Sequence, residues 1–242
     1  MVIDEGLRQV LQRANRVVVL TGAGISAESG VPTFREAQDG LWDQYDPEDV
    51  ATPEAFQRNP RRVWAWYAHR RQLAQEVEPN AGHWALVEWS RALSWLQVVT
   101  QNVDGLHQRA GSEHVIELHG NIHRDRVFDG PLAAEVDDAE LPRCPETGAV
   151  LRPDVVWFGE QLPEGAMEQA VAAVRSADLM LSVGTSAVVQ PAASLPLEAL
   201  EREIPVVEIN AEPTPLTPVA SWHFLGSAGE LVPTLVRSAA SG

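Results

Sequence analysis

The sequence contains a single cysteine, Cys144, and no lysine among its 242 residues. One thiol excludes an internal disulfide and a metal cage built from several thiolates. Because chains without disulfides are typical of reducing compartments, we expect a cytoplasmic location. No apolar stretch approaches the roughly 20 residues that a membrane-spanning helix needs. The first 16 residues have the pattern of an amphipathic helix rather than of a signal peptide. The sequence therefore predicts no membrane association.

Positive charge is also scarce. The chain has 18 basic residues, all arginine, against 34 acidic residues, which gives a formal net charge of −16. This balance argues against general binding to the phosphates of nucleic acids, and we expect no nucleic-acid partner. It is compatible with attracting cationic partners such as lysine-rich peptides, although solubility alone also explains it.

The chain does contain a regular alternation of short apolar segments and helix-like segments. Five runs rich in Val, Leu and Ile predict strands: 17–20, 95–100, 114–118, 179–184 and 205–210. Further segments predict helices: 80–93, 165–176, 194–203 and 228–238. This alternation is typical of a doubly wound α/β fold, in which helices cover both faces of a parallel sheet. Ligands of such sheets bind beyond the carboxyl ends of the strands, where polar or glycine-containing segments follow all five runs.

The first strand run leads into a glycine-containing loop. Gly22, Gly24 and Ala27 fit the G-x-G-x-x-G/A pattern of dinucleotide-binding loops. A dehydrogenase of this class has a second strand that ends in an acidic residue about 20 positions later. Residues 31–45 lack such a strand, and the candidate ribose contacts Asn210 and Glu212 lie far downstream. The loop predicts nucleotide binding and gives little support for hydride transfer.

Two segments interrupt the alternation. Residues 35–78 contain turn sequences and one long helix near 60–77. Residues 121–155 have an irregular pattern with glycine, proline and acidic residues. We expect the two segments to form a smaller lobe that is inserted into the sheet domain.

Eight short motifs occur in order between about residue 16 and residue 234. They are "GAGISAESGVPTFR", "GLW", "TQNVDGLHQRAG", "ELHG", "RPDVVWFGE", "VGTSAVVQP", "IN" and "GSAGELVP". Together they resemble the sirtuin family of NAD-dependent protein lysine deacylases. The resemblance implies a Rossmann-like NAD-binding domain of residues 1–34, 79–120 and 156–242, and a small lobe of residues 35–78 and 121–155. It also implies NAD as co-substrate and acyl-lysine proteins or peptides as partners.

The same resemblance implies which residues contact NAD. The loop from Gly22 to Arg35 would hold the pyrophosphate and cover the nicotinamide ribose, which Phe34 would shield from water. Gln101, Asn102 and Asp104 would surround the nicotinamide and its ribose, and the later motifs would contact the adenosine half. The full expected set is Gly22, Ala23, Gly24, Ile25, Ser26, Glu28, Phe34, Arg35, Trp42, Gln101, Asn102, Val103, Asp104, Gly184, Thr185, Ser186, Asn210, Ala211, Glu212 and Ala228.

Three residues are expected to act in catalysis, namely His119, Asn102 and Asp104. In the implied reaction the acyl oxygen displaces nicotinamide, and a ribose hydroxyl then loses a proton. A largely neutral imidazole such as His119 suits that step as general base. The products would be free lysine, nicotinamide and O-acyl-ADP-ribose.

Each of these assignments has a structural alternative. A lone histidine after a strand is usually structural, which applies to His119. Asp104 lies in an Asn-x-Asp-Gly sequence, which is an ordinary turn with side-chain caps. Asn210 could be a loop residue that is bound to its own backbone.

The "VVWFGE" segment at 155–160 alternates as an extended strand. In the family it pairs with the backbone of the bound peptide, a mode in which main-chain hydrogen bonds accept many sequences. The expected peptide contacts are Val156, Trp157, Phe158 and Gly159. The alternative is a plain buried strand.

The predicted helix near 60–77 has an arginine on its apolar face. Val63, Trp66, Tyr67, Arg70, Leu73, Ala74 and Val77 share one helical stripe. A guanidinium there is costly unless an anion pairs with it, and arginine grips carboxylates with two parallel hydrogen bonds. Tyr67 and Arg70 resemble the Tyr-x-x-Arg pair of sirtuins that act on succinyl- and malonyl-lysine. Thr33 fits the same group, because many deacetylating members carry aspartate at that position. The alternative is an internal salt bridge to Asp or Glu.

The zinc site that is common in the family is degenerate here. Cys144 lacks its partner, because Thr147 occupies that position, and residues 125–130 contain no cysteine. Tetrahedral zinc needs four good ligands, so we expect no zinc. Two other functions stay open: an NAD glycohydrolase or mono-ADP-ribosyltransferase that uses the same pocket, and a catalytically silent nucleotide-binding module.

Overall fold

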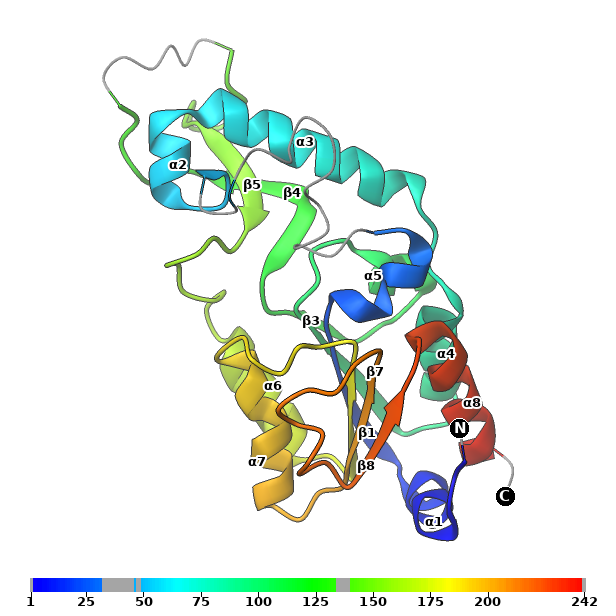
Figure 1. Cartoon of the computed structure of the whole chain (residues 1–242). Helices are drawn as coiled ribbons and strands as arrows, with labels where there is room; N and C mark the ends of the chain where they lie inside the picture. Colours follow the sequence, from blue (N-terminus) through cyan, green and yellow to red (C-terminus); the bar gives the residue numbers. More distant parts are fainter. Residues whose placement is uncertain (1, 32–45, 47–48, 134–139, 241–242) are drawn as a thin grey trace.

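A computed structural model describes residues 2–31, 46, 49–133 and 140–240 of the chain. Its main sheet has six parallel strands in the order β3-β2-β1-β6-β7-β8 (Figure 1). The strands are β1 Arg16–Thr21, β2 Trp95–Thr100, β3 Val115–Glu117, β6 Leu179–Val183, β7 Val206–Asn210 and β8 Trp222–Leu225. The predicted α/β fold is therefore confirmed, with five of the strands where the apolar runs lie. The sequence analysis missed β8, because only one side of this short edge strand is half-buried.

Helices cover both faces of the sheet. α1 Glu5–Arg13, α4 Ala81–Ser90 and α8 Ala228–Ala240 pack on one face, where Leu11, Leu86 and Val232 join the strands in one core. α6 Ala166–Arg175 and α7 Leu195–Glu201 pack on the other face through Ala170 and Leu195 (Figure 1). Their starts carry local signals, such as Asp4, whose side chain accepts from the Leu7 amide at 2.7 Å.

A second group of elements lies beyond the carboxyl ends of the strands (Figure 1). It contains α2 Pro53–Arg58, α3 Pro60–Glu76 and the antiparallel pair β4 Gly120–Val127 and β5 Leu151–Val155. These elements have a core of their own, which includes Phe56, Trp66, Tyr67, Ile122 and Trp157. The helix predicted near 60–77 is confirmed.

The prediction of irregular structure over residues 121–155 was wrong for β4 and β5. In β4 only the first three residues are buried, and exposed charged residues follow them. This strand therefore has no apolar run that a sequence pattern could detect. The assignment of exact residues to two lobes stays a prediction.

The strand order reverses between β1 and β6, which are neighbours in the sheet although β2 and β3 lie between them in the chain. In open α/β sheets the loops that leave two such strands diverge and form the usual ligand-binding crevice. Short helical turns, Ala23–Ile25 and Ala27–Ser29, follow β1 at this point. The short helix α5 Leu106–Ala110 follows β2.

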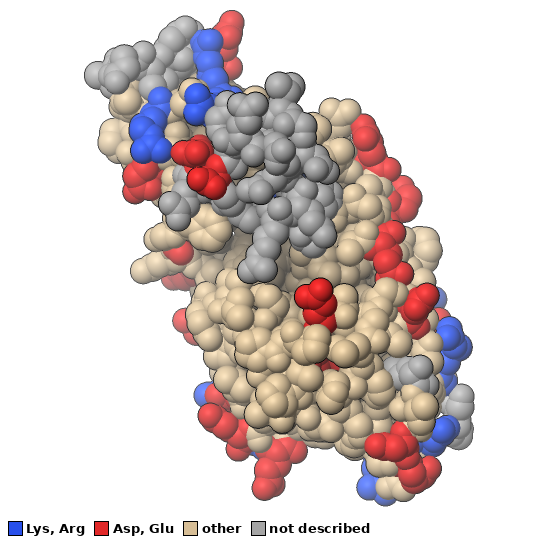
Figure 2. Space-filling view, viewed as in Figure 1, with Lys and Arg blue, Asp and Glu red and all other residues tan. Residues whose placement is uncertain are grey.

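Charge is unevenly distributed over the surface. Figure 2 shows acidic side chains along the rim of the sheet-containing part, whereas most of the face between them is uncharged. Across the described residues, no helix has both the length and the apolar composition to cross a membrane.

Candidate functional site

The loops after β1 and β6 touch each other through glycine backbones. The Gly24 amide donates to the Gly184 carbonyl oxygen at 2.9 Å, and the Gly22 amide donates to Val183 at 3.1 Å. A Cβ on Gly24 would lie 2.6 Å from the Gly184 Cα atom. Gly184 itself has a φ of 63°, in the region that favours glycine. The glycines are therefore required for the approach of one loop to the other, in addition to any approach of a ligand.

The side chains that follow β1 and β2 form one hydrogen-bonded group. The Ser26 hydroxyl donates to the Asp104 carboxylate at 2.7 Å. The side-chain amide of Asn102 donates to the Gly22 carbonyl oxygen and to the Ser26 hydroxyl, both at 3.1 Å. These contacts tie the segment after β2 to the glycine loop. The predicted residues Ser26, Asn102 and Asp104 thus lie together.

Asp104 is buried, and its second oxygen accepts from the Leu106 amide at 2.9 Å. Gly105 between them has a φ of 73°. This is the side-chain-capped turn that the sequence left open as an alternative for Asp104. Burial raises the pKa of Asp104, and hydrogen bonds from Leu106 and Ser26 oppose that rise.

His119 follows β3 with its ring oriented by a backbone contact. Its Nδ1 lies 2.9 Å from the carbonyl oxygen of Gln101. A carbonyl oxygen only accepts hydrogen bonds, so we assign the proton to Nδ1, which leaves a lone pair on Nε2. Burial lowers the pKa of His119. The ring is therefore a neutral base with its free lone pair at Nε2.

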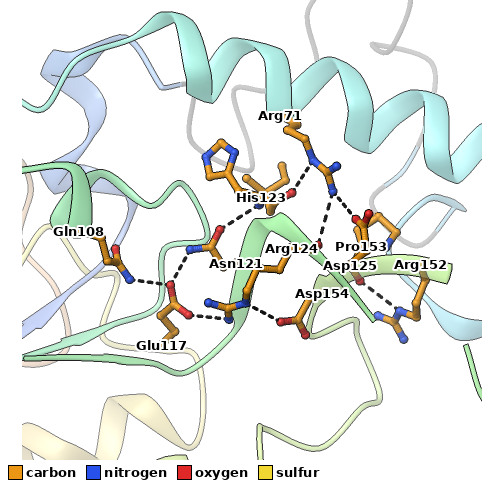
Figure 3. Close-up of polar contacts among 11 residues, drawn as sticks. Arg71, Gln108, Glu117, Asn121, His123, Arg124, Asp125, Arg152, Pro153 and Asp154 are labelled. Atoms are coloured by element: carbon orange, nitrogen blue, oxygen red, sulfur yellow. Dashed lines mark hydrogen bonds and ion pairs between the residues drawn. The ribbon is translucent and has the colours of Figure 1, made fainter. Parts of the chain in front are cut away.

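A polar network holds Glu117 and Asn121, which stand two positions before and two positions after His119 in the chain (Figure 3 shows Glu117 and Asn121). Glu117 accepts from Gln108 at 2.7 Å and from Asn121 at 2.6 Å, and it pairs with Arg124 at 2.7 Å. Arg124 also donates to Asp154 of β5 at 3.0 Å. The network joins the end of β3 to β4 and β5. Sequence reasoning did not assign Glu117 a role, because its partners Gln108, Asn121 and Arg124 lie on other elements.

The neighbouring contacts extend this network to α3 and to the segment after β2. Arg71 donates to the Ile122 carbonyl oxygen at 2.7 Å and pairs with Asp125 at 2.6 Å (Figure 3). The His123 ring lies 3.0 Å from the Asp104 carbonyl oxygen. The residues that follow His119 in the chain are thus connected to α3 and to the segment after β2.

The segment after β5 lies against the backbone of His119. The Val156 amide donates to the His119 carbonyl oxygen at 2.9 Å. Trp157 is buried, whereas Phe158 is 56% exposed. An exposed Phe158 between Trp157 and Gly159 is inconsistent with the alternative of a plain buried strand.

The prediction of an extended strand through residue 160 was wrong. β5 ends at Val155, Gly159 has a φ of 83°, and the Glu160 amide donates back to the Trp157 carbonyl oxygen at 3.0 Å. The Glu160 carboxylate also accepts from the Trp157 amide at 2.8 Å and so closes the turn.

An ion pair that sequence reasoning missed holds this turn. The buried Arg152 pairs with Glu160 and donates to the Val155 carbonyl oxygen at 2.6 Å. Arg126 lies 3.2 Å from the same carboxylate. Both Arg152 and Glu160 belong to the "RPDVVWFGE" motif, but only the fold brings them together.

Tyr67 and Arg70 lie one turn apart on α3, as predicted. Tyr67 is 2% exposed, and its hydroxyl oxygen accepts from the Trp157 indole at 2.9 Å. The Arg70 guanidinium lies over the Trp66 ring, 4.8 Å from its centroid. Burial lowers the pKa of Arg70, while Tyr67 and Asp104 raise it. The sequence left open an internal salt bridge as the alternative role of Arg70, and Asp104 is one candidate for its partner.

The residues expected near adenosine lie after β6 and β7 and at the start of α8. Thr185 is buried with its hydroxyl 3.2 Å from that of Ser182, and Ser186 is exposed. Asn210 donates to the Glu212 carbonyl oxygen at 2.9 Å, which is the loop contact left open as its alternative. The buried Glu208 accepts hydrogen bonds from Thr217 at 2.6 Å and from Thr214. Sequence reasoning did not identify Glu208.

The other expected contacts occupy the same edge of the sheet. Ala23 and Ala211 are exposed, Ile25 and Ala228 are buried, and Val103 is half-buried. The carboxylate of Glu28 accepts from the Gly229 amide in the first turn of α8. Glu28 therefore connects the glycine loop to that helix.

Two buried histidines near the end of β1 were not identified from the sequence. His83 and His107 are buried with ring centroids 4.9 Å apart. His107 bonds the Thr21 hydroxyl at 2.9 Å. Burial lowers their pKa values, to about 4 for His83 and about 3 for His107. Both rings are neutral members of the core at physiological pH.

Thr33, Phe34, Arg35 and Trp42 lie outside the described residues. Within the described ranges, no cluster of three or more His, Cys, Asp or Glu side chains could hold a metal ion. Cys144 is half-buried, and hydrogen bonds from Thr147 lower its pKa. The expectation of no zinc stays a prediction.

The donor set at this edge fits a dinucleotide. Asn102, Gln101 and Asn210 offer amides, and Ser186 an exposed hydroxyl, which suit ribose hydroxyls and a carboxamide. The glycine loop after β1 lies at the same edge, where the amides of Gly22, Gly24 and Ile25 already donate to carbonyl oxygens of the protein. His119 lies at the same edge, just after β3.

The comparison with known proteins gives consistent results. A model of the Sir2 family matches residues 22–191. The chain is 54% identical to an NAD-dependent protein deacylase of Thermus thermophilus, over 93% of this chain and 91% of that one. It is similar to the crystal structure of a Sir2 homologue in complex with NAD, with a TM-score of 0.90 at 46% identity over 99% and 94% of the chains. It is also similar to Sir2 with a p53 peptide and NAD+, with a TM-score of 0.83 at 29% identity over the whole of both chains.

Proposed function

The chain belongs to the Sir2 family and is an NAD-dependent protein deacylase; we propose that it removes succinyl and malonyl as well as acetyl groups from protein lysines. The observation that carries the proposal is the placement of the buried Tyr67 and the half-buried Arg70 one turn apart on α3. Acyl-lysine proteins and peptides are its proposed partners.

His119 acts as the general base in this proposal. Bound NAD supplies an electrophilic ribose carbon with nicotinamide as leaving group. The hydrogen bond from Nδ1 to Gln101 holds the His119 ring with Nε2 unprotonated, ready to accept a proton from a ribose hydroxyl. Asn102 and Asp104 position the glycine loop through Ser26 and would hold the nicotinamide half.

The remaining expected contacts are proposed to hold NAD at the edge where they lie. The glycine loop with Ser26 would bind the pyrophosphate, and the segments after β6 and β7 would bind the adenosine. The elements around β4, β5 and α3 form the small lobe, which we propose folds without zinc on its own apolar core.

Tyr67 and Arg70 would bind the carboxylate of an acidic acyl group. The guanidinium offers two parallel donors to a carboxylate, and the phenol offers a third. Stacking on Trp66 orients the guanidinium. Because the surroundings are buried, a charge-assisted hydrogen bond there is worth about 1.5–3 kcal/mol.

The test compares kcat/KM for succinyl- and acetyl-lysine peptides in wild type and Arg70→Met. We expect the ratio of succinyl to acetyl activity to fall by about 10-fold to 100-fold, as those energies require. Arg62→Met removes an exposed arginine from the same helix and is the matched control, with no change in ratio. An equal loss on both substrates in Arg70→Met would show that Arg70 does not recognise the acyl anion.

A further inference from the structure

The hydrogen bond between Trp157 and Tyr67 has a fixed direction. An indole nitrogen is only a donor, so the Tyr67 oxygen is the acceptor in their 2.9 Å contact. Both side chains are only 2% exposed, so water does not compete for this bond. Their rings are tilted, with centroids 6.4 Å apart.

The direction of that bond determines what Tyr67 offers to a ligand. The lone pair facing Trp157 is occupied, and the Tyr67 proton must therefore point elsewhere. Burial raises the pKa of Tyr67, so the hydroxyl keeps its proton at working pH. A phenol that accepts one hydrogen bond becomes a better donor for the next, because chains of hydrogen bonds polarise one another.

Three contacts hold Trp157 and prevent the indole from turning away. The Arg152 guanidinium lies over the Trp157 ring, 3.2 Å from its centroid. The Trp157 amide donates to Glu160 at 2.8 Å, and Glu160 pairs with Arg152. Phe56 packs at a centroid distance of 5.4 Å from the same ring. The position of the indole N–H is thus set by the turn after β5.

We propose that Trp157 determines acyl selectivity by fixing the Tyr67 hydroxyl as a donor toward the acyl group. This rests on the proposed function of Tyr67 and Arg70. An acyl group that ends in a carboxylate accepts the Tyr67 proton, whereas an acetyl methyl cannot. Trp157 is a positioning residue for that contact and acts through Tyr67.

The experiment is a double-mutant cycle with Trp157→Phe and Tyr67→Phe, read as the ratio of succinyl to acetyl kcat/KM. We expect Trp157→Phe to lower this ratio by about 10-fold to 100-fold, the worth of one charge-assisted hydrogen bond, mostly through a higher KM for the succinyl peptide. In the Tyr67→Phe background the same change should leave the ratio unaltered. An unaltered ratio in the single variant, or an equal fall in both backgrounds, would overturn the proposal.

A second variant guards against loss of the fold. Benzothienylalanine at position 157 keeps the shape of the indole but replaces its N–H by sulfur, and it should lower the ratio as Trp157→Phe does. An unaltered ratio with this side chain would also refute the role of the N–H. If Arg70→Met lowers the ratio and the position-157 variants do not, only this inference fails. If Arg70→Met has no effect on the ratio, the proposed function fails instead.

Discussion

At the scale of single residues, the contact between His119 and Gln101 determines which ring nitrogen can act as a base. The carbonyl oxygen of Gln101 occupies Nδ1 at 2.9 Å, and the backbone of His119 in turn accepts from Val156 at 2.9 Å. The base and the segment proposed to bind the peptide are therefore held by one short stretch of chain. A shift of the His119 ring would therefore also move the segment after β5, and the reverse.

The buried position of His119 has a consequence for the pH dependence of the reaction. Burial lowers the pKa of the ring below its ordinary value of about 6.5, so the ring stays unprotonated at lower pH than an exposed histidine. We expect the acid limb of kcat/KM on an acetyl peptide to have its midpoint below pH 6.5. His119→Ala should lose about 10²-fold to 10⁴-fold in activity.

The measurement is the pH profile of kcat/KM in wild type, with the thermal stability of both proteins followed over the same range. A midpoint above pH 6.5 in a fully folded enzyme would contradict the assignment of His119 as the base. An active His119→Ala variant would be equally damaging, because no other base is assigned.

Single residues also show where sequence reasoning succeeds and where it stops. Tyr67 and Arg70 are three positions apart, so helical periodicity alone places them on one face. The partner of Tyr67 is Trp157, which is 90 positions away, and no local pattern indicates that contact. Asp104 and Asn210 make the local contacts that turn chemistry predicts, so for them the sequence contained both possibilities.

At the scale of elements, the carboxyl ends of β1 and β6 form the base of the crevice. Their loops meet through Gly22, Gly24 and Gly184, with hydrogen bonds of about 3 Å between the backbones. The sequence analysis attributed Gly22 and Gly24 to phosphate binding and Gly184 to the adenosine half, and it gave none of them a role in packing. The contact between loops belongs to strands that are more than 150 residues apart, and only the sheet order reveals it.

Gly24→Ala tests this packing. The added Cβ would lie 2.6 Å from Gly184, so one loop must move, at a typical overpacking cost of about 1–3 kcal/mol. We expect a melting temperature lowered by several degrees and weaker NAD binding by titration calorimetry. Gly6→Ala is the control, because its nearest neighbour lies at 3.4 Å. Unchanged stability and NAD affinity in Gly24→Ala would mean that the loops are not tightly packed.

The predictability of the elements follows their burial. The central strands β1, β2, β6 and β7 are buried on both faces and read as continuous apolar runs. β4 and β8 have exposed or half-buried residues over most of their length, and both were missed. The turn after β5 was missed because Glu160 and Arg152, rather than local propensity, bend the chain there.

At the scale of the whole molecule, the proposed site draws on two groups of elements. The sheet provides His119, Asn102 and the glycine loops, and the elements around α3 provide Tyr67 and Arg70. The Glu117 network and the Val156 contact join the two groups beside His119 (Figure 3). An enzyme of this design should bring NAD and an acyl-lysine together from opposite sides.

The most direct test is mass spectrometry of the products formed from NAD with succinyl-lysine or acetyl-lysine peptides. We predict O-succinyl- or O-acetyl-ADP-ribose in amounts equal to nicotinamide and free lysine, and we predict that His119→Ala forms neither O-acyl-ADP-ribose. Release of ADP-ribose without an acyl peptide, transfer of ADP-ribose to protein, or no turnover of either peptide would contradict this account.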